Sequence, residues 1–283
     1  LANSFLDFQN FLGKGLGLDN GCSSLISWGE ATAGTDLDGK CVISRHLDWD
    51  DQSVIIRNQV MIVHFPAEED EQPWLLIGFA GQMSVLSGLN QSGVAVMQHM
   101  LSDEYTGASL NKSYEPVWFT MRKAIESADY NGDGLSNCLD INDAVLANIN
   151  GFADSYIITG AAPSTNIDNE KIATIIEVAP AEPYITIRNT DFEDGIPSEN
   201  LYAANSSIGR NNELNYCVRY NAVMSHIGAG TLIGKSENKN LMLDYSSSCA
   251  FGGGGNIQFM QYVPEDNYLA LAYHTTLGTQ ACE

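Results

Sequence analysis

Residues 21–50 constrain the fold most strongly, because they contain two runs of β-forming residues on either side of a turn. The first run lies at 22–28 and the second at 41–49, and the segment 36–39 between them reads Asp-Leu-Asp-Gly. An Asp-Gly turn between two such runs predicts a β-hairpin. The start of the first strand and the end of the second therefore lie side by side.

The hairpin brings Cys22, at the start of its first strand, near Arg45 and Asp48, at the end of its second. A guanidinium beside a thiol favours the thiolate, and a carboxylate there can hold an amine or a water. The stretch therefore predicts an activated cysteine nucleophile. The structural alternatives are a small buried apolar residue for Cys22 and a surface ion pair for Arg45 and Asp48.

This stretch resembles the cysteine branch of the N-terminal-nucleophile (Ntn) hydrolases. It is most similar to the acyl-coenzyme A:6-aminopenicillanate acyltransferase-like family (peptidase family C45), with bile-salt hydrolases, penicillin V acylases and acid ceramidase as more distant relatives. The similarity covers most of residues 20–275. Five motifs carry it: Gly21-Cys22-Ser23-Ser24, Ala31-Thr32, Asp38-Gly39, Arg45-His46-Leu47-Asp48-Trp49 and Gly88-Leu89-Asn90-Gln91-Ser92-Gly93. His46 replaces the family's usual Asn, and we interpret it as a neighbour of the site.

The resemblance implies an α+β protein with the αββα sandwich of the Ntn hydrolases. The order of elements agrees, because strands come first and last with helices between them, which favours two stacked antiparallel sheets over a doubly wound parallel sheet. The glycine run at 252–255 is expected to be a strand-edge loop. Strands are predicted at 53–65 (as one strand or a pair), 74–79, 84–86, 93–100, 156–159, 172–178, 184–188, 201–204, 257–263 and 268–274, and helices at 117–128, from 141 to 148, and at 212–226.

By this resemblance Cys22 is the nucleophile and its own α-amine is the base, so the bond between Gly21 and Cys22 must be cut. In the family the thiol makes that cut itself, by attack on the preceding carbonyl. Residues 1–21 then correspond to a propeptide, and an amphipathic helical pattern is present near their start. The remaining domain is 22–283. We expect the propeptide to lie over or beside the Cys22 pocket, with Gly21 within a few ångströms of the sulfur.

The resemblance also implies roles for other residues. Asp48 would hold the α-amine, and Arg45 would lower the thiol pKa or hold substrate. Asn205 would donate to the oxyanion of the tetrahedral intermediate, although an ordinary turn asparagine is the alternative. His99 falls near a second oxyanion position where the family often has Asn.

A further site arginine is expected on the helix predicted at 212–226. Arg219 matches the family's Ser-x-x-Arg-Tyr/Phe pattern, and we expect it to reach toward the nucleophile. Arg210 is a second candidate for the site arginine. The structural alternative is that Arg219 only packs on an amphipathic helix.

A second group of residues that could form a site lies at 129–140. Oxygen-bearing groups fall at the offsets of an EF-hand calcium loop, with glycine at its sixth position. The twelfth residue is Asp, which resembles dockerin-type loops, and a plain acidic turn is the alternative. We predict an inserted structural calcium site with these ligands: Asp129, Asn131, Asp133, the Leu135 carbonyl, Asn137 and Asp140.

Composition limits the partners and the compartment. The formal net charge of −22 argues against nucleic acid and anionic membranes, which bind basic patches. No apolar run reaches the roughly 18 residues of a membrane span. Six cysteines are present, and if Cys22 is free, at most two disulfides form and one thiol remains. A calcium loop suits extracellular fluid, so we predict a secreted protein without an organic cofactor.

The predicted activity is cleavage or transfer of an acyl group at a linear C–N amide bond of a small molecule or peptide, through a Cys22 thioester. Two alternatives remain. One is an acid-ceramidase-like lipid amidase, which would need a long apolar groove. The other is a non-enzymatic, calcium-bound secreted binding domain.

Overall fold

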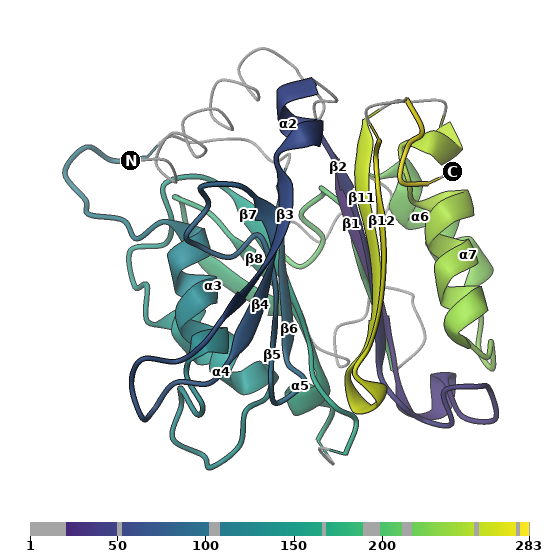
Figure 1. Cartoon of the computed structure of the whole chain (residues 1–283), viewed down its shortest axis with the longest axis horizontal. Coiled ribbons are helices and arrows are strands. Elements are labelled where there is room, and N and C mark those ends of the chain that lie inside the picture. Colours follow the sequence, from purple (N-terminus) through teal and green to yellow (C-terminus); the bar gives the residue numbers. More distant parts are fainter. Residues whose placement is uncertain are drawn as a thin grey trace.

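Two antiparallel sheets lie face to face, with helices on their outer faces (Figure 1). The chain has 283 residues. The computed structural model describes residues 21–49, 53–101, 108–165, 168–188, 199–210, 217–251, 255–275 and 278–282. The expected propeptide helix therefore lies outside the described residues, as does the start of the helix predicted from 212.

The first sheet has five strands and contains the predicted hairpin. Cys22 lies opposite Leu47, and Ser27 lies opposite Val42, so the strand pairing is confirmed. The connection between the two strands includes a 3-10 turn (η1, Gly29–Ala31), and Asp38 and Gly39 both have positive φ at its tight turn. The strands of this sheet in spatial order are β10 (Asn200–Ala203), β1 (Cys22–Ser27), β2 (Val42–Asp48), β11 (Asn256–Val263) and β12 (Tyr268–Tyr273).

The second sheet has seven strands, and its spatial order follows the sequence order. Each neighbouring pair is antiparallel, although the long segment 101–155 separates the fourth strand from the fifth along the chain. Its strands are β3 (Gln59–His64), β4 (Trp74–Phe79), β5 (Ser87–Asn90), β6 (Ala95–Met100), β7 (Tyr156–Ala161), β8 (Ala173–Val178) and β9 (Ile185–Arg188).

Helices cover both outer faces (Figure 1). On the seven-stranded sheet lie α3 (Val117–Glu126) and α4 (Cys138–Leu146), with the short α5 (Asn169–Ile172) beside β8. On the five-stranded sheet lie α6 (Val218–His226) and α7 (Lys235–Tyr245). The short α2 (Ser53–Arg57) precedes β3. Among the described helices, none is long and apolar enough to cross a bilayer.

The side chains of β1 alternate between two environments, as the period of a strand requires. Ile26 packs between the sheets with Ile43 and Met97, whereas Leu25 packs on the helix side with Tyr220 and Met242 of α6 and α7. Every residue of β1 and β2 is buried. Cys22 therefore faces the space between the sheets, and Asp48, on β2, faces the helices.

Several predicted boundaries were wrong. Residues 53–57 form a helix, and the strand expected at 84–86 is β5 at 87–90. Helix α4 begins at Cys138, before the predicted 141, because Asn137 and Asp140 form a capping box. Helix α7 was not predicted, since its sequence is largely polar and only Asn238 and Met242 are buried.

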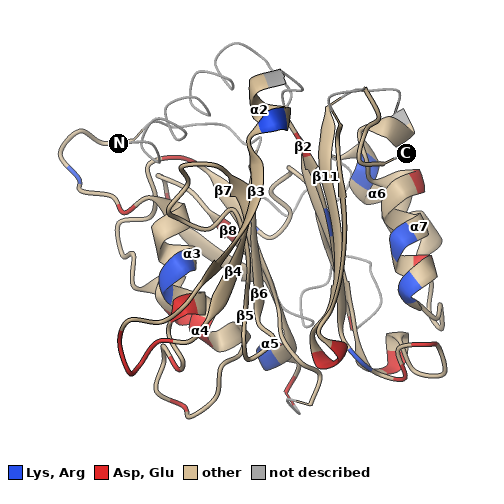
Figure 2. Ribbon diagram, viewed as in Figure 1, with Lys and Arg blue, Asp and Glu red and all other residues tan. Residues whose placement is uncertain are grey.

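Acidic residues, red in Figure 2, gather in loops at the lower end of the sheets, and they include the exposed residues at 36, 38 and 68–70. Cys22 and Asp48 lie at the opposite end of the hairpin from the loop that contains 36–38, because Cys22 pairs with Leu47. Among the described residues, these acidic loops therefore lie away from the predicted nucleophile.

Candidate active site

The peptide bond between Gly21 and Cys22 is held at both of its polar groups. The Gly21 carbonyl accepts a hydrogen bond from the backbone N–H of Asp48 at 2.7 Å. The Cys22 N–H donates to Oδ1 of Asn205 at 2.8 Å. This bond lies at the start of β1, so residues on the helix side and residues between the sheets can both contact it.

The thiol of Cys22 faces a fixed guanidinium. Nη2 of Arg45 lies 3.6 Å from Sγ, and the same nitrogen donates to the Gln98 carbonyl at 2.8 Å. Nη1 of Arg45 donates to Oγ of Ser87 at 3.0 Å. Cys22 and Arg45 are 2% and 1% exposed, so their attraction is little screened by water. Both neighbours of the arginine belong to the seven-stranded sheet, which positions its charge beside the sulfur.

Burial raises the pKa of the Cys22 thiol, and this effect outweighs the lowering by Arg45. Asp48 also raises this pKa, whereas Arg219 and a backbone hydrogen bond from Met100 lower it. Arg45 thus acts in the predicted direction, but the net shift is opposite to the expected activation. With the Gly21–Cys22 bond intact the thiol is protonated near neutral pH, so the thiol must lose its proton during the attack.

The carboxylate of Asp48 is anchored on one side. Its Oδ1 accepts hydrogen bonds from Oγ of Ser248 at 2.8 Å and from Nδ2 of Asn256 at 2.6 Å. Its Oδ2 has no hydrogen bond within the described part of the chain and lies 3.8 Å from Nη1 of Arg219. A Cβ built on Gly21 would lie 3.3 Å from this oxygen, so Oδ2 is next to the Gly21–Cys22 bond.

Burial raises the pKa of Asp48 above the usual range of a carboxyl group. The hydrogen bonds from Asn256 and Ser248, and then the charge of Arg219, lower that pKa in part. Cations and donors thus offset only part of the burial effect on this carboxyl group.

Arg219 and Asn205 meet at the backbone of Cys22. Nη1 of Arg219 donates to the Cys22 carbonyl at 3.1 Å, and its Nη2 donates to Oδ1 of Asn205 at 2.5 Å. Nδ2 of Asn205 donates to the Met100 carbonyl at 2.5 Å. Arg210 instead donates to the Ala181 carbonyl at 3.1 Å. Of the two arginines, the structure therefore brings Arg219 to the site.

His99 lies deeper between the sheets and does not hydrogen-bond to the thiol. Its Nδ1 lies 3.2 Å from the Ala204 carbonyl, so this nitrogen carries the proton, and its Nε2 accepts from Oγ of Ser24 at 2.8 Å. Burial, followed by the charge of Arg45, lowers the pKa of His99 well below its usual value, so the ring is neutral. The single N–H of the ring already donates to the Ala204 carbonyl. The contacts of His99 therefore do not support the predicted oxyanion role.

Five contacts of the site were missed from the sequence: the backbones of Gln98 and Met100 and the side chains of Ser87, Ser248 and Asn256. The only local signal was the glycine run that precedes Asn256. Its last member, Gly255, has a φ of +89°, and a Cβ there would lie 2.3 Å from the Trp49 carbonyl. Only glycine allows this close approach to the segment that follows Asp48.

The predicted calcium loop forms a turn that is stabilised from within. Oδ2 of Asp129 accepts from the Gly134 N–H at 2.8 Å, and Oδ2 of Asp140 accepts from the Asn137 N–H at 2.7 Å. Nζ of Lys171 lies 3.5 Å from Oδ2 of Asp133. Within the described ranges, no three or more His, Cys, Asp or Glu side chains are grouped so that they could hold a metal.

One disulfide joins Cys249 to Cys282, and the other four cysteines are free and buried. Cys22 is among the free ones, as its predicted role requires. The pairing is within the predicted limit of two disulfides.

Comparison with known proteins places the fold. No protein-family model and no curated protein sequence matches the chain. Among solved structures, it is similar to an N-acylethanolamine-hydrolyzing acid amidase ortholog from Caenorhabditis elegans, with a TM-score of 0.55 and 14% identity over 87% of this chain and 97% of that one. It is also similar to a variant of the conjugated bile acid hydrolase from Clostridium perfringens, with a TM-score of 0.52 and 10% identity over 89% and 92% of the two chains.

These likenesses confirm the predicted fold class. The chain has the αββα fold of the Ntn hydrolase superfamily, with two antiparallel sheets flanked by helices. At this level of identity the similarity concerns the fold alone, so the chemistry has to be argued from the residues around Cys22.

Proposed function

We propose that this chain is an Ntn amide hydrolase that cuts its own Gly21–Cys22 bond and then cleaves or transfers acyl groups at linear C–N amides. The observation that carries the proposal is the bond itself, held by Asp48 and Asn205 beside a buried thiol that faces Arg45. The amide hydrolases with a similar fold support the same reaction class, since one acts on N-acylethanolamines and the other on conjugated bile acids.

The first step of the proposal is the self-cleavage. Sγ of Cys22 attacks the Gly21 carbonyl carbon, and the Asp48 N–H stabilises the negative charge that develops on the carbonyl oxygen. The C–N bond then breaks, and the thiol proton ends on the Cys22 nitrogen, which leaves Gly21 joined to Sγ as a thioester. Water hydrolyses this thioester and releases a carboxylate on Gly21 together with a free thiol and a free α-amine on Cys22.

In turnover, the new α-amine supplies the base that the protonated thiol lacks. Its reference pKa of about 8 allows it to accept the Sγ proton near neutral pH. The bare Oδ2 of Asp48 lies where it can hold this amine. The thiolate attacks the substrate carbonyl, the leaving amine takes the proton, and a Cys22 thioester remains. Water then yields a carboxylic acid, or an acceptor amine yields a new amide.

This proposal is tested on the cleaved enzyme with a panel of N-acyl amides that differ in acyl length and amine. We expect hydrolysis of at least one member, and hydroxylamine should release the trapped acyl group as its hydroxamate, because a thioester is the intermediate. Absence of both cleavage and acylation of Cys22 across the panel would contradict the proposal. That result would favour a non-enzymatic binding domain.

We also propose that the loop at 129–140 binds calcium through the predicted side chains and the Leu135 carbonyl. Gly132 and Gly134 have φ of 78° and 87°, which lets the chain wrap tightly around the oxygen-bearing side chains. A ligand that binds only the native state stabilises it, by about 2.7 kcal/mol at a concentration 100-fold above its dissociation constant.

Calcium is therefore expected to raise the Tm by roughly 5 °C or more, and a chelator should reverse the change. Asp133→Ala should remove the response, whereas Asp244→Asn, an exposed change on α7, should retain it. A Tm that is the same with calcium and with chelator would rule out the site.

We further propose that the protein acts outside the cell. The Cys249–Cys282 disulfide supports this location, because such bonds persist in oxidising compartments and are rare in the cytosol.

A further inference from the structure

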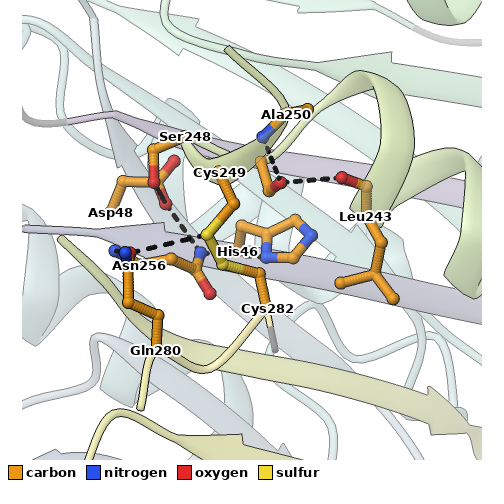
Figure 3. Close-up of a disulfide and its surroundings, with 10 residues drawn as sticks. His46, Asp48, Leu243, Ser248, Cys249, Ala250, Asn256, Gln280 and Cys282 are labelled. Atoms are coloured by element: carbon orange, nitrogen blue, oxygen red, sulfur yellow. Dashed lines mark hydrogen bonds between the residues drawn. A yellow bond between two sulfur atoms is a disulfide. The ribbon is translucent and has the colours of Figure 1, made fainter. Parts of the chain in front are cut away.

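Two residues outside every recognised motif converge on the same oxygen of Asp48. Oγ of Ser248 and Nδ2 of Asn256 both donate to Oδ1, from the segment after α7 and from the start of β11 (Figure 3). Asp48 is 4% exposed, and its other oxygen has no hydrogen bond among the described residues. One oxygen is thus fixed and the other is left free beside Gly21.

Asn256 is itself held by His46. Its Nδ2 lies 3.0 Å from Nδ1 of His46, and burial lowers the pKa of that imidazole to about 3. A neutral ring with its proton on Nε2 accepts at Nδ1, so the two hydrogens of the amide go to His46 and Asp48. Asn256 is fully buried, and these two acceptors fix the orientation of its amide.

The disulfide ties both donors together. Cys249 directly follows Ser248, and Cys282 directly follows Ala281, whose N–H donates to the Asn256 carbonyl at 3.0 Å. The Asn256 N–H donates to Oε1 of Gln280 at 3.2 Å. The disulfide therefore ties the Ser248 segment to residues 280–282, and hydrogen bonds tie the Asn256 segment to the same residues (Figure 3).

Arg219 competes for the same carboxylate. Its Nη1 lies 3.8 Å from Oδ2 of Asp48, too far for a hydrogen bond but close enough for strong attraction. Without its two donors, Asp48 would turn toward this cation. The free oxygen would then be paired with Arg219 and would not be available to the α-amine of Cys22.

We propose that Ser248 and Asn256, whose segments are both tied to residues 280–282, are positioning residues that keep the free oxygen of Asp48 directed at the Cys22 amine. This inference rests on the proposed function. The charged and titratable groups that face Asp48 are the Cys22 thiol on β1, Arg45 and His46 on β2, and Arg219 on α6. None of them replaces the two donors, because none hydrogen-bonds to Oδ1.

The test is the pH profile of kcat for the cleaved enzyme, with an N-acyl amide from the panel as substrate. Ser248→Ala removes one donor to Asp48, so the carboxylate should hold the α-amine less well and the pKa of that amine should fall. The acid limb of kcat, which reports the amine, should therefore move downward by about one pH unit, and KM should stay within about twofold. Ser248→Thr, which keeps the hydroxyl, should restore the limb. Ser225→Ala is the control, because it removes an exposed serine hydroxyl from α6.

Reduction of the Cys249–Cys282 disulfide provides a second test of the inference. Reduced wild-type enzyme should show the same downward shift as Ser248→Ala, and reduction of Ser248→Ala should add little, because both changes act through one unit. An unchanged acid limb in Ser248→Ala, or shifts that add fully, would overturn the inference while the proposed function stands. Wild-type protein without cleavage or turnover would overturn both.

Discussion

Replacing Cys22 with alanine should abolish both the cut at Gly21–Cys22 and the turnover of acyl amides, because one thiol serves both reactions. We expect activity to fall by at least about a thousandfold, as is usual when a covalent nucleophile is removed. The variant should still fold, since the thiol makes no hydrogen bond that an element depends on. Intact mass and amide turnover are measured on the same preparation.

Cys138→Ala is the matched control for this variant. Cys138 is also a free, buried thiol, but it lies on α4 and hydrogen-bonds to the Ile172 carbonyl, away from Arg45 and Asp48. It should cleave and turn over like the wild type. Cys22→Ser should fold and process slowly, because a hydroxyl is a weaker nucleophile than a thiol. Full turnover by Cys22→Ala would disprove the mechanism.

Replacing Glu177 with alanine should be the most destabilising of the changes considered. Its carboxylate is fully buried, lies 2.9 Å from Nε of Arg188, and accepts from the backbone N–H groups of 208–210. The variant removes this buried ion pair and the acceptor of three backbone N–H groups, which should lower the free energy of unfolding by about 3–5 kcal/mol and the Tm by roughly 10 °C.

The control is Glu126→Ala, which breaks the partly exposed ion pair with Arg122 on α3. Such surface pairs contribute at most about 1 kcal/mol, so its unfolding should stay close to that of the wild type. Because residues 208–210 follow Asn205 closely, Glu177→Ala should also reduce turnover. A change of unfolding free energy below about 1 kcal/mol in Glu177→Ala would show that this buried pair does not hold the segment.

The hairpin that carries Cys22, Arg45 and Asp48 could be predicted because its information is local. Two runs of β-forming residues and an Asp-Gly turn define its two strands within residues 21–50. The partner strand β11 is different, because it pairs with β2 from some 200 residues further along the chain, and no local pattern specifies that pairing. Helix α7 was missed for a related reason, since its packing on the sheet is not visible in its polar sequence.

The candidate site was likewise predictable from the sequence only in part. Cys22, Arg45, Asp48, Asn205 and Arg219 were expected from the resemblance, and the structure brings them within a few contacts of one another. What the sequence could not provide was the balance between burial and charge on the thiol, because both depend on the folded environment.

The contacts of Ser248 and Asn256 were also beyond prediction. These residues reach Asp48 across about 200 positions of sequence, through a loop and a disulfide. His99 differs from them, because its place in the family pattern suggested an oxyanion donor, whereas its Nδ1 contacts the Ala204 carbonyl.

The most direct test of the central claim is the intact mass of the wild-type chain before and after incubation at neutral pH. The account predicts that the Gly21–Cys22 bond is cut, so that a species with the mass of residues 22–283 and an N-terminal cysteine accumulates. A chain that keeps Gly21 joined to Cys22 throughout, yet hydrolyses acyl amides, would contradict it. Such a chain has an amide where the base of the proposed cycle should be.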